Sequence, residues 1–327
     1  MSGQPEPSIE VHLKEGDLQA ALTQDVLRGL QDPEGKWLPP VWFYDDRGSE
    51  LFDEITRIPE YYLYRAERRL LEAHADEIAE ISQAEVLVEL GAGTCEKSRI
   101  LLDAMRRSGS LETYVPLDVS DTTLLNAAMS ICEEYPGLDV HAVVADFILH
   151  VDRIPANGRR LIAFLGSTIG NLGPDQRKRF FFDLDCVMRA GEHLLLGADL
   201  VKDVSRLVAA YDDAKGVTAE FNKNVLNVLN RELGADFDPS QFEHVAIYNE
   251  KSSHIEMRLR SLLDQTVFIK QLGIEVPFDR GEDLLTETSA KFTREALESE
   301  LFAAGLVVKR MWEDAEGFLL TLAAPYC

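Results

Sequence analysis

The sequence predicts a doubly wound α/β fold that carries a second, α+β lobe. Short apolar strands alternate with helices from about residue 65 to 199, which is typical of a parallel sheet covered on both faces. Alternating strands typical of an antiparallel layer interrupt this rhythm between about residues 200 and 290, and the chain closes with a helix and a hairpin. We therefore expect an α/β core from residues 65–199 and 291–327, and a lobe from residues 1–64 and 200–290.

The N-terminal part of the chain shows one clear helical pattern. It is "DLQAALTQDVLRGLQ", and a proline-rich break follows it. The next stretch, "WFYDDRGSELFDEITRIPEYYLYR", mixes aromatic residues with charges, and we predict no regular core element there.

The α/β core is predicted from helical periodicity and from continuous apolar runs. In chain order we expect a helix over 66–81, the strand "EVLVEL", a glycine loop with a helix after it, the strand "TYVPLDV", a helix, the strands "LDVHAVVADF" and "RRLIAFLG", a helix over 174–188 and the strand "EHLLLGADL".

The inserted and C-terminal segments have a different pattern. Two helices are expected over 204–213 and 217–233, followed by the strands "HVAIYN", "HIEMRLRS" and "QTVFIKQL". The end of the chain predicts an N-capped helix, "TREALESELFAAG", and two strands, "LVVKRMWED" and "FLLTLAAP".

Composition narrows the class of protein. The 327 residues are 46% hydrophobic with a net charge of -24, which suits a soluble globular protein and disfavours nucleic acid or anionic membranes as partners. The four cysteines (Cys95, Cys132, Cys186 and Cys327) form no paired motif, so neither a disulfide framework nor a thiolate metal site is expected. With no signal-peptide pattern and no membrane-length apolar run, we expect a cytoplasmic protein.

A glycine-containing loop follows the first core strand, in "VELGAGTCEKSR". Gly91 and Gly93 allow a tight strand-to-helix turn close to a ligand, although such turns also serve only to pack a helix. Both a phosphate-binding P-loop and a dinucleotide fingerprint require glycine at position 96, where the chain has Glu96. The loop therefore suits a nucleoside without a pyrophosphate.

Polar groups also follow the next two core strands. Asp118 can accept both ribose hydroxyls, or it can cap the following helix; Asp146 and Phe147 can bind a purine, or they can be a loop aspartate beside a core ring. Because ligands of open α/β sheets bind at the carboxyl ends of the strands, three such ends together favour a nucleoside site.

This arrangement resembles the class I S-adenosylmethionine-dependent methyltransferases, in which a Rossmann-like sheet ends in an antiparallel hairpin. Six further segments make the resemblance specific to one family: "WFYDDRGSELFDEITRIPEYY", "GAGTCEKSR", "FLGSTIGNL", "LVKDVSRLVAAYDDAKGVTAEFNKNVLNVLNREL", "HIEMRLRS" and "LLTETSAKF". Together these are similar to the histidine-specific Nα-methyltransferases of ergothioneine biosynthesis, from about residue 18 to the end. That family trimethylates L-histidine to hercynine with S-adenosylmethionine, which becomes S-adenosylhomocysteine.

The resemblance implies roles for individual residues. On the cofactor side it implies Gly91, Gly93, Lys97, Asp118, Asp146 and Phe147, with Lys97 pairing with the methionine carboxylate. Around the reacting amine it implies Gly166, Thr168 and Tyr44, and on the substrate side Tyr61, Phe52, Asn171, Tyr211, Met257, Glu287 and Ser289. Asn171 and Tyr211 would hold the substrate carboxylate, and Glu287 would accept the imidazole N–H.

Plainer interpretations exist for several of these residues. Tyr44 and Phe52 can be core residues, Tyr211 can be helix packing, and Ser289 can be an ordinary strand residue. The chain also differs from the expected family pattern at Ala92, Cys95 and Ala290, which are small-for-small changes. Relatives with altered imidazole-binding residues methylate other amino acids such as tryptophan, so the intact Glu287-x-Ser289 pair favours histidine.

The implied reaction needs neither a metal nor a general base from the motifs. The neutral amine would attack the sulfonium methyl in line, and its proton would leave to solvent through water near Thr168 and Tyr44. Two other hypotheses are a silent ligand-binding homologue and a nicotinamide oxidoreductase, against which Glu96 argues. We expect a small-molecule substrate and a monomer.

Overall fold

The computed structural model describes residues 6–13, 15–155 and 157–326, and the chain forms two compact units. The first unit contains residues 1–13, 63–201 and 292–327, and the second contains residues 14–62 and 202–291. Cys327 lies outside the described residues. In the described part of the chain, no helix is both long enough and apolar enough to cross a membrane.

The first unit is built on a sheet with the strand order β1-β5-β4-β3-β6-β7-β14-β13. In this sheet order, every pair of neighbouring strands from β1 to β7 is parallel, whereas β14 pairs antiparallel with both β7 and β13. The predicted α/β class with a C-terminal hairpin is therefore confirmed. The strands are β1 (Ser8–Val11), β3 (Val86–Leu90), β4 (Thr113–Asp118), β5 (Asp139–Val144), β6 (Arg160–Phe164), β7 (His193–Asp199), β13 (Leu306–Glu313) and β14 (Phe318–Pro325).

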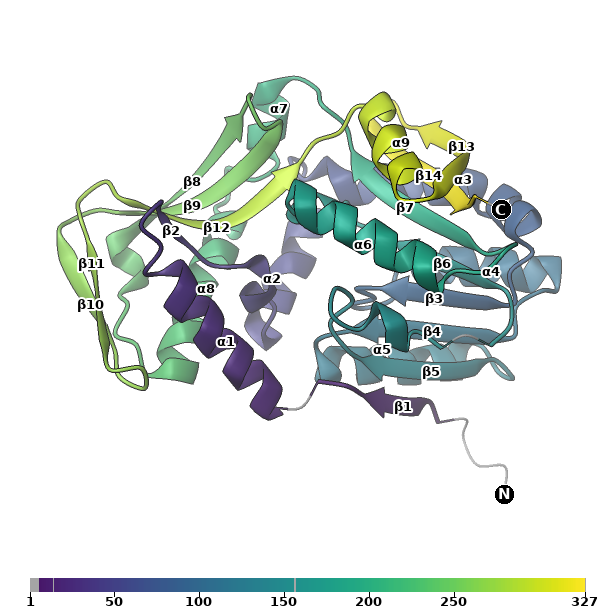
Figure 1. Cartoon of the computed structure of the whole chain (residues 1–327), viewed down its shortest axis with the longest axis horizontal. Coiled ribbons are helices and arrows are strands. Elements are labelled where there is room, and N and C mark those ends of the chain that lie inside the picture. The colour runs from purple at the N-terminus through teal and green to yellow at the C-terminus, as the bar shows by residue number, and fades with distance from the viewer. Residues whose placement is uncertain (1–5, 14, 156, 327) are drawn as a thin grey trace. The chain divides into compact units, whose positions relative to one another are not determined.

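Helices cover both faces of this sheet, which explains why β3, β6 and β7 are buried along their whole length. Figure 1 shows α6 on the near side of the sheet, with α3 and α4 paler on the far side. The helices are α3 (Tyr62–Ser82), α4 (Ser98–Ser108), α5 (Asp121–Glu134), α6 (Pro174–Val187) and α9 (Arg294–Ala303), with short 3₁₀ turns η2 (Val151–Arg153) and η3 (Thr168–Asn171). The expected N-cap of the last helix is confirmed, because the Thr293 hydroxyl accepts the Ala296 N–H.

The edge strand β1 was not predicted. Ser8 to Val11 pair in parallel with His141 to Val144 of β5, so this segment belongs to the first unit and not to the lobe expected over residues 1–64. Its sequence, "SIEV", is short and exposed, and it becomes a strand only because β5 offers an unpaired edge.

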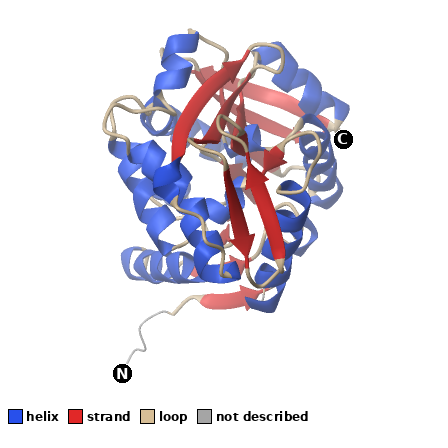
Figure 2. Ribbon diagram, turned by 90° about the vertical axis from the view of Figure 1, so that its left-hand side faces the viewer, coloured by secondary structure: helices blue, strands red, loops and turns tan. Residues whose placement is uncertain are grey.

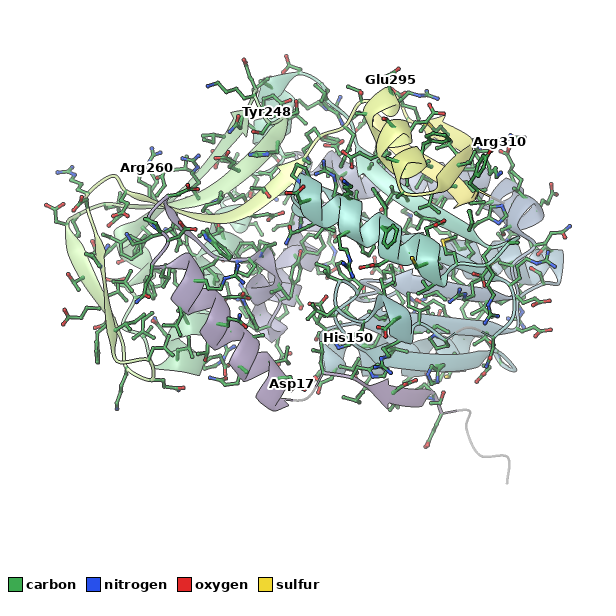
Figure 3. All side chains as sticks on the ribbon, in the orientation of Figure 1. Asp17, His150, Tyr248, Arg260, Glu295 and Arg310 are labelled. Carbon is green, nitrogen blue, oxygen red and sulfur yellow. The ribbon has the colours of Figure 1, made fainter. Side chains whose placement is uncertain are left out.

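The second unit contains a mixed four-stranded sheet and a separate antiparallel hairpin. A four-stranded sheet has the order β2-β12-β9-β8, in which the two-residue β2 pairs parallel to β12. A separate hairpin, β10 and β11, faces the viewer in Figure 2. Arg260, labelled in Figure 3, joins β9 to β12 through hydrogen bonds of 2.7 and 3.0 Å to Asp283. The strands are β2 (Lys36–Trp37), β8 (Phe242–Asn249), β9 (His254–Ser261), β10 (Gln265–Ile269), β11 (Ile274–Phe278) and β12 (Asp283–Ala290).

The helices of the second unit include one that the sequence analysis missed. We predicted no regular core element in the aromatic and charged segment, but η1 (Pro40–Phe43) and α2 (Asp46–Arg57) lie there. Asp45 caps α2 by accepting the Gly48 N–H, and α2 buries Leu51 and Ile55 at helical spacing. The other helical elements are α1 (Glu15–Gly29), α7 (Val204–Ala209), α8 (Val217–Leu233) and the 3₁₀ turn η4 (Pro239–Gln241).

Candidate functional site

The glycine loop after β3 is tied to the end of β4. Gly91 and Gly93 have φ values of 72° and 50°, which glycine adopts without strain. The N–H groups of Gly91 and Ala92 both donate to the carbonyl of Leu117, and the Gly93 N–H donates to Asp118 Oδ2 at 2.8 Å. Two of the three predicted strand ends therefore form one structural unit.

Asp118 is held by backbone groups on both of its carboxylate oxygens. Besides the Gly93 bond, Oδ1 accepts the Ser120 N–H at 3.0 Å, and Ser120 is the residue that precedes the first turn of α5. Burial raises the pKa of Asp118, and these backbone hydrogen bonds oppose the rise. The carboxylate is therefore fixed in direction at the carboxyl end of β4.

The third strand end carries Asp146 and Phe147. Asp146 Oδ1 accepts the N–H groups of Ile148 and Leu149 at 2.7 and 3.3 Å, so this carboxylate stabilises its own turn. The half-buried Phe147 ring lies 5.0 Å from that of Phe164, and it is the nearest side chain to the space beside Gly91. The ring is thus placed next to the glycine loop, as a purine-binding face requires.

Two charged residues that follow the glycine loop are paired within the first unit. Glu96 accepts a hydrogen bond of 2.5 Å from the Tyr64 hydroxyl, and burial together with Glu96 raises the pKa of Tyr64 to about 12. Lys97 forms an ion pair with the fully buried carboxylate of Glu67. Any pairing of Lys97 with a methionine carboxylate would therefore have to be shared with Glu67.

The segment after β6 forms a turn that is anchored by Glu67. Gly166 has φ 78°, and its N–H reaches both carboxylate oxygens of Glu67 at 2.8 and 2.9 Å. The Thr168 hydroxyl donates to the Leu165 carbonyl at 2.9 Å, and half-buried Asn171 ends the 3₁₀ turn η3. This is where "GSTIGN" places its small residues and its carboxamide.

Glu67, which contacts two of the predicted site residues, was not predicted from the sequence. It lies on α3 in the charged run "RAERR", which gives no sign that one of its carboxylates is buried. The space that it occupies depends on Gly197 of β7, because a Cβ atom at that position would lie 1.9 Å from Glu67 Oε1. The nearest available signal was the glycine within the otherwise apolar strand "HLLLGAD".

A second buried carboxylate lies on β3, beneath the glycine loop. Glu89 Oε2 accepts hydrogen bonds from the hydroxyls of Ser98 and Tyr114, the latter at 2.7 Å. Burial raises the pKa of Glu89 to about 7, although both hydroxyls favour its charged form. This carboxylate therefore changes its charge near neutral pH.

In the second unit, the predicted aromatic residues form one cluster. The Tyr44 ring lies 5.7 Å from Phe52 and 5.5 Å from Phe221, and the Phe52 ring lies 6.1 Å from Tyr61. Tyr61 in turn is 6.3 Å from Tyr211. These edge-to-face contacts bring four predicted residues from separate segments together, with Tyr44 and Phe52 remaining half-buried.

The polar residues of the second unit meet on β12 and beside α7. The Tyr211 hydroxyl is 2.8 Å from Ser289 Oγ, and Lys291 Nζ lies 2.8 Å from the same hydroxyl. Glu287 is paired in register with the buried Met257 of β9. Burial raises the pKa of Glu287 to about 7, while the positive charge of Lys291 opposes the rise.

The predicted site residues thus divide between the two units. The first unit holds Gly91, Gly93, Lys97, Asp118, Asp146, Phe147, Gly166, Thr168 and Asn171, and the second holds Tyr44, Phe52, Tyr61, Tyr211, Met257, Glu287 and Ser289. Lys291 was overlooked, although the alternation Glu287-x-Ser289-x-Lys291 in "TETSAKF" places these residues on one side of a strand.

Comparison with known proteins identifies the family. A family model described as histidine-specific methyltransferase, SAM-dependent, matches residues 22–324. The chain belongs to the SAM-dependent histidine-specific methyltransferases. The predicted resemblance is therefore confirmed, and S-adenosylmethionine is the methyl donor of this family.

Relatives of this methyltransferase cover nearly its whole length. A histidine N-alpha-methyltransferase of Mycobacterium tuberculosis (strain CDC 1551 / Oshkosh) is 54% identical over 97% of this chain and 99% of its own. One of Mycolicibacterium smegmatis is 50% identical over 97% and 98%. More distantly, the L-tryptophan methyltransferase of Psilocybe serbica is 29% identical over 91% and 92%. The relatives of this chain thus include proteins named for two different amino acids.

Proposed function

We propose that this methyltransferase transfers methyl groups from S-adenosylmethionine to the α-amino group of L-histidine. Three successive transfers would give Nα,Nα,Nα-trimethylhistidine, hercynine, a step of ergothioneine biosynthesis. The observation that carries the choice of histidine is the cluster of Glu287, Ser289 and Tyr211, supported by 54% identity to a histidine N-alpha-methyltransferase across nearly both chains. The Glu287 carboxylate can accept the N–H of an imidazole, a hydrogen bond that an apolar side chain cannot make.

On the substrate side, each residue is assigned the group that its chemistry suits. Glu287 accepts the imidazole N–H, with Tyr61 and Ser289 beside the ring and Met257 as an apolar wall. Asn171 and Tyr211 donate to the α-carboxylate, and as neutral donors they bring no competing charge to the amine. The aromatic faces of Tyr44 and Phe52 attract the product ammonium.

On the cofactor side, the first unit supplies a fixed polar frame. Asp118, oriented by two backbone N–H groups, would accept the ribose hydroxyls, and Phe147 would stack on the adenine beside Asp146. The loop of Gly91 and Gly93 allows the nucleoside to approach the backbone closely, and Lys97 would neutralise the methionine carboxylate.

The chemistry is a direct displacement. The nitrogen lone pair of the substrate forms a bond to the methyl carbon as the carbon–sulfur bond breaks, which leaves S-adenosylhomocysteine. After the first and second transfers an N–H proton leaves to water near Thr168 and Tyr44, and the third transfer leaves a quaternary ammonium with no proton to lose. Orientation of the two reactants supplies most of the acceleration. Gly166 carries no side chain that would compete with the growing methylated amine for space.

The main test is incubation of the full chain with S-adenosylmethionine and a panel of the common amino acids, followed by mass spectrometry. We expect histidine to gain one, two and three methyl groups in time order, with one S-adenosylhomocysteine formed for each methyl group. Preferred methylation of tryptophan would overturn the assignment of histidine. Binding of histidine without any transfer would instead indicate a silent homologue.

We further propose that the enzyme acts as a monomer in the cytoplasm. Its net charge of -24 favours dispersed molecules over association. Light scattering coupled to size exclusion should give a mass near 36.7 kDa, and twice that mass would contradict the proposal.

A further inference from the structure

Lys291 is a buried cation directly after β12. Its side chain belongs to a residue that is only 3% exposed, although lysine is almost never fully buried in proteins. Its backbone N–H donates to the Ser253 carbonyl at 2.7 Å, which extends the pairing of β12 with β9 by one residue. Because side chains alternate along a strand, Lys291 shares a side with Ser289 and Glu287.

The ammonium group contacts two hydroxyls of the candidate substrate site. Lys291 Nζ lies 2.8 Å from the Tyr211 hydroxyl and 3.1 Å from Ser289 Oγ, and the two hydroxyls are 2.8 Å apart. The ammonium also lies 4.7 Å from the centre of the Tyr211 ring. The three groups therefore form a closed triangle, and Tyr211 and Ser289 are themselves buried.

The number of hydrogen atoms in this triangle limits what it can present to a ligand. An ammonium group can only donate, so both hydroxyl oxygens act as acceptors toward Lys291. Each hydroxyl carries one hydrogen, and the bond between Tyr211 and Ser289 uses one of them. A single hydroxyl hydrogen is left to be donated outside the triangle.

We propose that Lys291 is a positioning residue that sets the direction of this last donor. Ser289 donates to Tyr211, and the Tyr211 hydroxyl donates to the substrate carboxylate, while the imidazole N–H is left to Glu287. This inference rests on the proposed function, because it takes the roles of Tyr211 and Ser289 from it. It adds a residue that none of those roles includes.

The positive charge of Lys291 also favours binding of the substrate carboxylate at the Tyr211 hydroxyl. It attracts the carboxylate of an amino-acid substrate toward Tyr211, and it lowers the pKa of Glu287 against the effect of burial. A buried cation is costly unless its surroundings use it, whereas an apolar side chain of similar length would fill the same space. The hydrogen bonds of Lys291 to two hydroxyls of the candidate substrate site are a use of the cation that an apolar side chain could not replace.

The test is a double-mutant cycle on the full chain with histidine as substrate. We expect Lys291→Met to raise the KM for histidine roughly 10- to 100-fold, with a much smaller change in kcat. The affinity for S-adenosylhomocysteine should stay at the wild-type value. In the Tyr211→Phe/Ser289→Ala background, the same substitution should change KM less than about threefold, because the groups through which it acts are gone. The exposed Lys251→Met serves as the matched control and should leave all constants unchanged.

The outcomes separate this inference from its alternatives. An unchanged KM in Lys291→Met, or an equal rise in both backgrounds, would overturn it. A parallel loss of kcat, cofactor affinity and melting temperature would indicate a purely structural role and would also overturn it. If Lys291→Met does not fold, Lys291→Arg replaces it in the same cycle, with the same criterion. If the wild-type chain does not methylate histidine, the proposed function itself is wrong, and this result needs no variant.

Discussion

The two units hold their candidate functional residues in different ways. In the first unit, backbone groups make the main contacts: Gly93 N–H to Asp118, Gly166 N–H to Glu67, and Asp199 N–H to Ser167. In the second unit, side chains contact side chains, as in the triangle of Tyr211, Ser289 and Lys291. A backbone N–H is available whatever side chain a residue carries, so a frame of backbone groups tolerates most substitutions. A cluster of side chains, in contrast, changes with every substitution. This difference is consistent with relatives of this chain being named for different amino acids.

The largest effect we expect comes from disturbing the frame of the first unit through Gly197→Ala. The new Cβ atom would lie 1.9 Å from Glu67 Oε1 and would displace the carboxylate from Gly166 and Lys97. Overpacking together with lost charged hydrogen bonds should lower the free energy of unfolding by roughly 4 kcal/mol.

Chemical denaturation measures this change, and Gly16→Ala is the matched control, because nothing lies within 4 Å of the added carbon there. If Gly197→Ala has the same free energy of unfolding as the wild type, the frame tolerates the added carbon better than its contacts indicate.

A pH series tests the first unit through the buried carboxylate of Glu89. Glu89 has a pKa raised by burial from 4.5 to about 7, so between these values the folded chain keeps a proton that the unfolded chain releases. The contribution of this group is fully present below pH 4.5 and is lost as pH rises through 7, a difference of about 3 kcal/mol.

The Glu89→Gln variant lacks this titration. We expect the difference in free energy of unfolding between wild type and Glu89→Gln to change across this window and to be constant outside it. A difference that stays constant from pH 4 to 8 would contradict a buried titrating Glu89.

The contrast between the units is tested most directly by Glu287→Ala. Loss of a charged acceptor should reduce kcat/KM for histidine roughly 100-fold, since such hydrogen bonds contribute about 1.5–3 kcal/mol. S-adenosylhomocysteine affinity, measured by calorimetry, should change less than about twofold. Equal losses of substrate use and cofactor affinity would refute the division of roles between the units.

The smallest effect is expected at Thr293, the exposed N-cap of α9, which lies two residues after Lys291 and has no assigned role itself. Thr293→Ala removes the acceptor of the Ala296 N–H and should lower the free energy of unfolding by about 1 kcal/mol. Thermal melting detects this change. Histidine kinetics should be unaffected, and a change in KM would mean that the cap influences the site.

The sequence predicted those parts of the fold that depend on local patterns. The strands of the first unit appear as continuous apolar runs, and α8 was expected over 217–233, where Val217–Leu233 is helical between two glycines with positive φ. Elements that depend on a tertiary partner were missed, as β1 shows, because only the edge of β5 makes it a strand. The hairpin strand β11 was missed for the same reason.

The candidate site was predictable to a different degree in each unit. Strand ends and glycines indicate a nucleoside site from general rules, whereas Tyr211, Glu287 and Ser289 could be named only through a resemblance of long motifs. Glu67 gave no signal, because nothing in a charged helical run distinguishes the carboxylate that will be buried. Side-chain convergence from distant segments leaves no local pattern to read.

The order of the strands has a consequence for folding during synthesis of the chain. The polypeptide passes between the two units after residues 13, 62, 201 and 291, so the first unit is not complete until the C-terminal segment has been synthesised. The last strand, β14, inserts between β7 and β13 and is the partner of β7, which is apolar and fully buried. A nascent chain still on the ribosome, or one truncated before residue 318, therefore exposes an open apolar edge that invites aggregation.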